Sequence, residues 1–151
     1  LDASQGLRRF FTVLDLFLGI FGSLALAVAS LGIINTLVMA VLERRREIGI
    51  LKAVGASDAD VEKLFFAEAG AMGLIGGVLG VLLGGAIGAA INYGTGIYLR
   101  RHQLPPETVW SAPAWLVAAA IAFAVLVSLA SGLYPARRAA KLDPIQALRY
   151  E

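Results

Sequence analysis

Few residues in this chain of 151 could carry out covalent or metal chemistry. The absence of cysteine excludes disulfides, thiolate metal sites and a cysteine nucleophile. The single histidine, His102, cannot form a histidine metal cluster by itself. The sequence contains no G-x-x-x-x-G-K-[ST] motif, so it lacks the phosphate cradle of an ATPase. We therefore predict no catalytic residue, no metal ligand and no cofactor bound by this chain itself.

The elements that would position any site are dominated by apolar residues. Hydrophobic residues make up 58% of the chain, against roughly 45–50% in soluble domains. Three runs without charge cover about residues 16–42, 70–91 and 114–134, and about 20 apolar residues suffice to cross a bilayer as a helix. We predict an all-α membrane protein with three transmembrane helices and one short cytoplasmic helix. The formal net charge of +2 indicates no basic surface for nucleic acid.

The predicted spans contain only mild polar residues: Ser23, Ser30, Asn35, Thr36, Ser128 and Ser131. Proton-coupled transporters and intramembrane proteases place ionisable or nucleophilic groups at depth. Their absence from the spans disfavours these classes and ion channels. Asn35 could donate a hydrogen bond across helices or be satisfied locally, and the sequence leaves both open.

The distribution of Lys and Arg predicts the orientation. Nine of these residues lie in the segment 43–63 and in the tail after Tyr134, and four lie on the other side. Because cytoplasmic loops carry the excess of Lys and Arg, we expect the segment 43–63 and the C-terminus in the cytoplasm. Tyr93, Tyr98, Trp110 and Trp115 then flank the outer loop as an interfacial aromatic belt.

Five glycines recur at spacings of three and four in the second span: Gly73, Gly77, Gly80, Gly84 and Gly88. Small residues on one helix face allow a second helix to approach closely. The stripe predicts helix packing, either static within one subunit or at a contact that slides. The glycine-rich "GGVLGVLLGG" belongs to this span and not to a nucleotide-binding loop.

The stretch "VLERRREIGILKAVGAS", residues 41–57, separates the first two spans. Residues 43–54 favour a short helix, with Gly55 available to cap its end and Ser57 spaced from Asp60 to cap the next helix. Ile50, Leu51 and Val54 fall on one face. That face could rest on lipid or dock into a groove of a protein partner, and the pattern alone does not decide between them. In the tail, Pro135 and Pro144 could each start a helix.

Three stretches carry a resemblance to a known family. "GIINTLVMAVLERRREIGILKAVGAS" and "DADVEKLFFAEAGAMGLIGG" are similar to the second helix, the loop after it and the third helix of ABC transporter permeases of the MacB/FtsX type. "GLYPARRAAKLDPIQALRYE" resembles the C-terminus of that family. The resemblance covers most of the chain and is weakest in the outer loop.

The resemblance implies that this chain, which starts at Leu1 without methionine, holds helices two to four of a longer permease. A first helix and an extracytoplasmic domain are then expected before it. The implied division of the chain is a stalk end at 1–12, helices at 13–42, 70–92 and 114–134, a coupling-helix loop at 43–69, an outer loop at 93–113 and a cytoplasmic tail at 135–151.

The resemblance also implies the partners and the site. The expected partners are an ABC ATPase subunit or domain, which would bind ATP and Mg²⁺, a second permease subunit in a homodimer or heterodimer, and the lipid of the bacterial cytoplasmic (inner) membrane. The ATPase contact would be the coupling helix, with residues Arg46, Glu47, Ile50, Leu51, Lys52, Ala53, Val54, Gly55 and Ala56. The chain would transmit ATP-driven motion to antibiotic or peptide efflux, lipoprotein release or hydrolase activation. A membrane anchor or scaffold without energy coupling is the alternative.

Overall fold

The computed structural model describes residues 3–103, 105 and 108–142, and this part of the chain is helical without strands. Four helices follow one another: α1 (Ala3–Glu43), α2 (Arg45–Ala53), α3 (Asp58–Arg101) and α4 (Ala114–Ala140). In the described residues α1, α3 and α4 are long and apolar enough to cross a membrane. The predicted all-α membrane fold is therefore confirmed.

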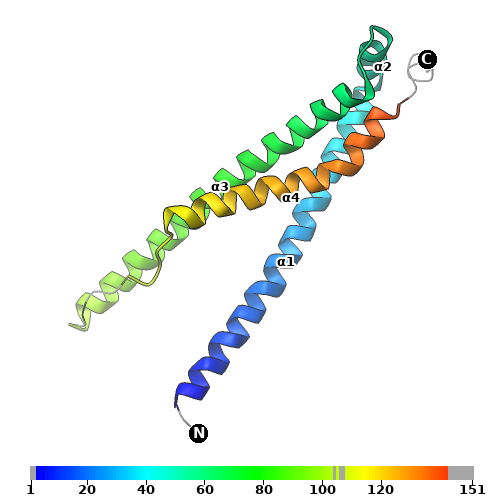
Figure 1. The fold of residues 1–151 in the computed structure, drawn as a ribbon. Coiled ribbons are helices and arrows are strands. Elements are labelled where there is room, and N and C mark those ends of the chain that lie inside the picture. The colour runs from blue at the N-terminus through cyan, green and yellow to red at the C-terminus, as the bar shows by residue number, and fades with distance from the viewer. Residues whose placement is uncertain (1–2, 104, 106–107, 143–151) are drawn as a thin grey trace.

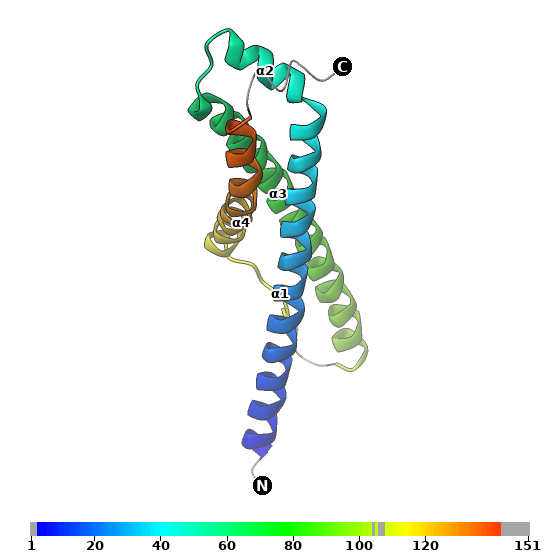
Figure 2. The same cartoon turned by 90° about the vertical axis from the view of Figure 1, so that its right-hand side faces the viewer.

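α1 meets α3 and α4 at one end of the molecule and diverges from them toward the other, while α4 runs along α3 (Figure 1). In Figures 1 and 2, α2 and the end of α4 lie at the closed end, while the N-terminus of α1 lies at the far end. Residues 5–29 of α1 are all exposed. An apolar helix without a polar face is typical of a membrane span, so this half of α1 is open to lipid or to other helices.

Two of the helices are much longer than the bilayer requires. At about 1.5 Å per residue, α1 with 41 residues and α3 with 44 are each more than 60 Å long, against a hydrocarbon core of about 30 Å. From Ala3 onward, the residues predicted as the stalk end belong to α1, the same unbroken helix that forms the first span. The helix α3 is also longer than the predicted second span. It runs from Asp58 to Arg101 and includes residues on both sides of that span that we expected in loops.

The core lies at the closed end, where all four helices contribute. Its buried members come from α1, α2, α3 and α4 and are Leu37, Val41, Ile48, Val61, Phe65, Ala69, Ala136 and Ala139. Gly132 lies where three helices converge, because a Cβ built on it would be 2.7 Å from the Cβ of Ala69 and 3.3 Å from Leu37 Cδ1. The Ser128 hydroxyl donates a hydrogen bond to the carbonyl of Ala69 at 2.5 Å. Small residues and a buried polar bond thus join α1, α3 and α4.

The glycine stripe of α3 divides into two parts. Gly73 and Gly77 lie against α4: a Cβ on Gly73 would be 2.6 Å from Ser128 Cβ, and one on Gly77 would be 3.1 Å from Ala124 Cβ. Gly80 and Gly84 have open space around them and line a groove with Leu116 and other residues of the outer half. The close approach of α3 and α4 is therefore concentrated at Gly73 and Gly77.

The outer loop is fastened to α3 by Asn92 and Gly88. The Asn92 side-chain amide donates to the carbonyl of Trp110 at 2.7 Å and accepts from the backbone N–H groups of Val109 at 3.1 Å and Trp110 at 2.9 Å. The Trp110 ring covers Gly88 so closely that a Cβ there would lie 2.2 Å from it. Gly88 thus faces an aromatic ring of the loop and not a neighbouring helix.

The prediction that Pro135 starts a helix is wrong, because Pro135 lies inside α4. Its ring is fully buried at the closed end, and this packing offsets the loss of one backbone hydrogen bond. Pro144, the other predicted helix start, lies outside the described residues.

Gly73→Ala should destabilise the protein by about 1–3 kcal/mol, because the added methyl overlaps Ser128 and backbone atoms of α4. Thermal unfolding in detergent measures this change. Gly80→Ala is the matched control, since nothing lies within 4 Å of its added Cβ and alanine favours the helix. Equal stability of the two variants would contradict the described packing of α3 on α4.

Candidate functional site

The short helix α2 has an inner face that belongs to the core. Ile48 is 2% exposed and Gly49 is buried beside it. A single residue, Arg44, separates α1 from α2, and its backbone continues the hydrogen bonding from Ala40 to Ile48. The position of α2 is therefore fixed by burial on one side and by the end of α1.

The outer face of α2 is also apolar. Ile50 is 47% exposed, Leu51 is 48% exposed and Val54 is 85% exposed. Within the part of the chain that the structure describes, these three side chains form an apolar surface at the extreme end of the bundle, and we call it the α2 patch. A helix that buries one apolar face and presents another is suited to bind a second surface.

The turn after α2 holds the α2 patch at a fixed angle to α3. Gly55 has φ +114°, and the N–H groups of Gly55 and Ala56 donate to the carbonyls of Lys52 and Leu51, which is the Schellman arrangement. At the start of α3, the Ser57 hydroxyl accepts from the Asp60 N–H, and the Asp60 carboxylate accepts from the Ser57 N–H at 3.1 Å. Both predicted caps are confirmed.

Two charged groups near the α2 patch have shifted pKa values. The hydrogen bonds from Ser57 lower the pKa of the Asp60 carboxyl. The Arg44 guanidinium donates to Glu47 at 3.0 Å, and this contact raises the pKa of Arg44. Because the folded pKa of Asp60 is lowered, its contribution to stability is present above the usual Asp pKa and is lost as pH falls through the lowered value.

Lys52 points away from the α2 patch and into the molecule. Its side chain is 9% exposed, and its ammonium is 2.7 Å from a carboxylate oxygen of Asp58. The same ammonium donates to the carbonyls of Ala140 and, at 3.0 Å, of Leu142. Lysine near a helix C-terminus satisfies carbonyls that have no partner within the helix. Lys52 therefore joins α2 to the end of α4 and to the start of α3.

Of the nine predicted contact residues, seven are exposed on or around the α2 patch and two are not. Ile50, Leu51 and Val54 form the α2 patch, and Arg46, Glu47, Ala53 and Gly55 are exposed around it. Ala56 is half-buried in the turn and Lys52 is turned inward. The sequence analysis did not predict that Ile48 would anchor α2 in the core or that Asn92 would fasten the outer loop. The only signal for the inner face of α2 was Gly49, which follows Ile48.

The fold and the α2 patch define a helical membrane protein that presents a short amphipathic helix between two of its spans. The family described as FtsX-like permease C-terminal matches residues 19–144. This chain belongs to that family.

Three relatives show where such chains occur. The chain is 38% identical over 140 residues to an uncharacterized ABC transporter permease, MJ1507, of Methanocaldococcus jannaschii. The aligned region covers 92% of this chain and 34% of that protein. It is 34% identical to the ABC transporter permease YtrF of Bacillus subtilis, over 97% of this chain and 35% of the relative. It is 39% identical to the macrolide export ATP-binding/permease protein MacB of Chromobacterium violaceum, over 91% of this chain and 20% of the relative. The chain thus spans between a fifth and about a third of these proteins.

Lys52→Met should lower the free energy of unfolding by about 2 kcal/mol, because it removes charged hydrogen bonds and leaves buried carbonyls unpaired. Denaturant or thermal unfolding in detergent measures the loss. Lys63→Met is the matched control, since the Lys63 side chain is 79% exposed and its ammonium lies as far as 3.8 Å from the Asp60 carboxylate. Such exposed pairs contribute about 0–1 kcal/mol. A Lys52→Met protein as stable as the Lys63→Met protein would show that Lys52 does not hold α4.

Proposed function

We propose that this chain is the membrane-spanning part of an ABC transporter permease and that the α2 patch docks on a cytoplasmic ABC ATPase. The observation that carries the proposal is the apolar surface of Ile50, Leu51 and Val54 on a helix whose other face is fixed in the core. The family match and the ABC permeases among the relatives support it. ATP and Mg²⁺ would bind on the ATPase, and this chain would transmit its motion.

The contacts around α2 are suited to transmission. Lys52 links α2 to the end of α4, Arg44 is the only residue between α1 and α2, and the turn 54–57 is capped on both sides. Movement of α2 by a partner would therefore reach three long helices at once. Since α1 and α3 are each longer than the bilayer is thick, they could carry this motion to the other side. Two sites coupled through one rigid element are what such a mechanism requires.

The membrane placement follows the charge distribution. We infer that α2 and the end of α4 face the cytoplasm of a bacterial cell, in its cytoplasmic (inner) membrane. The wholly exposed half of α1, residues 5–29, supports contact with further helices or with a second permease subunit. Relatives are named for export of macrolides and of pyoverdine, and we propose export or related work outside the membrane for the whole protein.

Leu51→Asp and Val54→Asp should each weaken ATPase binding by about tenfold or more, because a carboxylate buried against an apolar surface is left unpaired. The loss of binding is measured as the ATPase concentration that gives half-maximal stimulation by the full-length permease in membranes. Ala59→Asp is the control, since Ala59 is exposed at the start of α3, where an acid is favourable. Full stimulation by both patch variants would favour the anchor or scaffold alternative.

The predicted orientation can be tested by cysteine labelling, because the native chain contains no cysteine. In intact cells, Ser57→Cys should resist a membrane-impermeant maleimide, and Gln103→Cys should react with it. Both positions are exposed, so permeabilised cells should label both. Labelling of Ser57→Cys alone in intact cells would reverse the orientation.

A further inference from the structure

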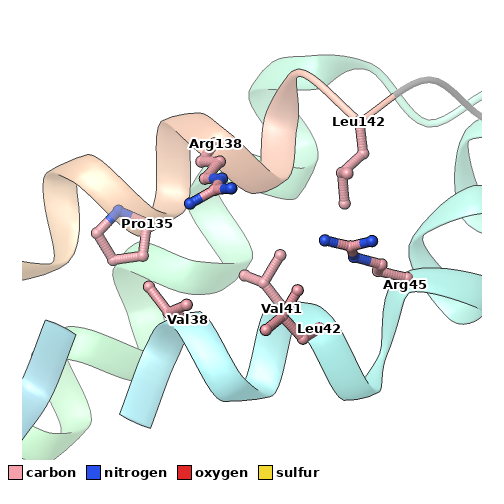
Figure 3. Close-up of a pocket in the computed structure, with 7 residues that line it drawn as sticks. All are labelled: Val38, Val41, Leu42, Arg45, Pro135, Arg138 and Leu142. Atoms are coloured by element: carbon pink, nitrogen blue, oxygen red, sulfur yellow. The ribbon is translucent and has the colours of Figure 1, made fainter. Parts of the chain in front are cut away.

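A small cavity lies between the ends of α1 and α4. It has a volume of about 60 Å³ and is lined by Val38, Val41, Leu42, Arg45, Pro135, Arg138 and Leu142. Figure 3 shows the guanidinium group of Arg138 above Val38 and Val41, and that of Arg45 on the other side of Val41, below Leu142. The cavity thus has an apolar floor and a rim with two positive charges.

The two arginines lack a carboxylate partner in the described part of the chain. Ion pairs there engage Arg44 with Glu47 at 3.0 Å and Arg137 with Glu62 at 3.8 Å, but not Arg45 or Arg138. None of the seven lining residues is acidic. Arg45 and Arg138 are both exposed, so their positive charges at this cavity are open to an anion from the surroundings.

A second cavity extends the positive rim. Arg138 is shared by both cavities, and the second is also lined by Arg137, Lys141 and Tyr134. Both lie at the ends of apolar helices, where a membrane-spanning protein meets the lipid headgroups. Basic pockets between transmembrane helices are suited to anionic lipid headgroups.

We propose that this cavity binds an anionic phospholipid, with its phosphate between Arg45 and Arg138. Guanidinium groups bind phosphate through paired, charge-assisted hydrogen bonds. The first part of an acyl chain would lie on Val38, Leu42 and Pro135. A bound lipid would link the start of α2 to the end of α4, which Lys52 also joins. This lipid site is independent of ATPase docking on the α2 patch.

The test uses the full-length permease in detergent and titrates it with phosphatidylglycerol or phosphatidylcholine, while thermal unfolding is followed. Phosphatidylglycerol should raise the Tm and phosphatidylcholine should raise it much less. Arg45→Gln and Arg138→Gln should each reduce the apparent affinity for phosphatidylglycerol about tenfold. The double variant should lose more affinity for phosphatidylglycerol than either single variant, because each side chain contributes hydrogen bonds to the same phosphate.

Arg100→Gln/Arg101→Gln is the control, because it removes the same charge from the exposed end of α3. It should keep the full response to phosphatidylglycerol. Arg45→Lys, which keeps the charge, should retain part of the affinity and shows that loss in Arg45→Gln is not misfolding. Inorganic phosphate at the same concentration should have little effect, because it cannot use the apolar floor.

Three results would overturn the proposal. A control variant that loses as much affinity as Arg45→Gln/Arg138→Gln would show general surface electrostatics. Unchanged affinity for phosphatidylglycerol in either single variant would show that the phosphate does not lie between Arg45 and Arg138. An equal effect of inorganic phosphate would indicate a simple anion site without lipid.

Discussion

The architecture depends on one close approach, at Gly132, where α1, α3 and α4 converge. Apolar side chains gain little by leaving lipid for protein, so membrane helices need close backbone packing and hydrogen bonds to associate. Gly132 admits Ala69 and Leu37, and the bond from Ser128 to the carbonyl of Ala69 satisfies a buried hydroxyl beside it. Because its contacts with the other helices lie near one end, α1 is joined to α3 and α4 there and diverges from them toward the other end. The closed end is where α2 is held.

The two faces of α2 follow from this junction. Its inner face completes the core through Ile48, and Lys52 binds the last carbonyls of α4. The outer face then carries the apolar residues that the core does not use. Lys52 lies within the stretch that we propose binds a partner, but its own role is internal, since its charge compensates the carbonyls at a helix end. In the proposed function, the α2 patch is the surface for the partner and the Lys52 contact is one path for its motion.

Much of the fold could be predicted because its signals are local. Three uncharged runs predicted the spans, and Gly55 and Ser57 predicted the turn between α2 and α3. The remaining features depend on contacts distant in the sequence. The spacing of the five glycines puts them on one face but does not say that α4 packs on Gly73 and Gly77 alone. Nothing near Lys52 indicates that residues 140 and 142 would be its acceptors. The local sequence around Pro135 favours a helix start. Its position inside α4 depends instead on packing at the closed end.

Site-specific photocross-linking tests the proposed contact between the α2 patch and an ABC ATPase most directly. A photoreactive amino acid at Val54 in the full-length permease, co-expressed with its ATPase, should give a permease–ATPase adduct. The same group at Leu82, exposed in the middle of α3, should not. An ATPase adduct from Leu82 but none from Val54, or lipid adducts alone from both positions, would contradict the claim.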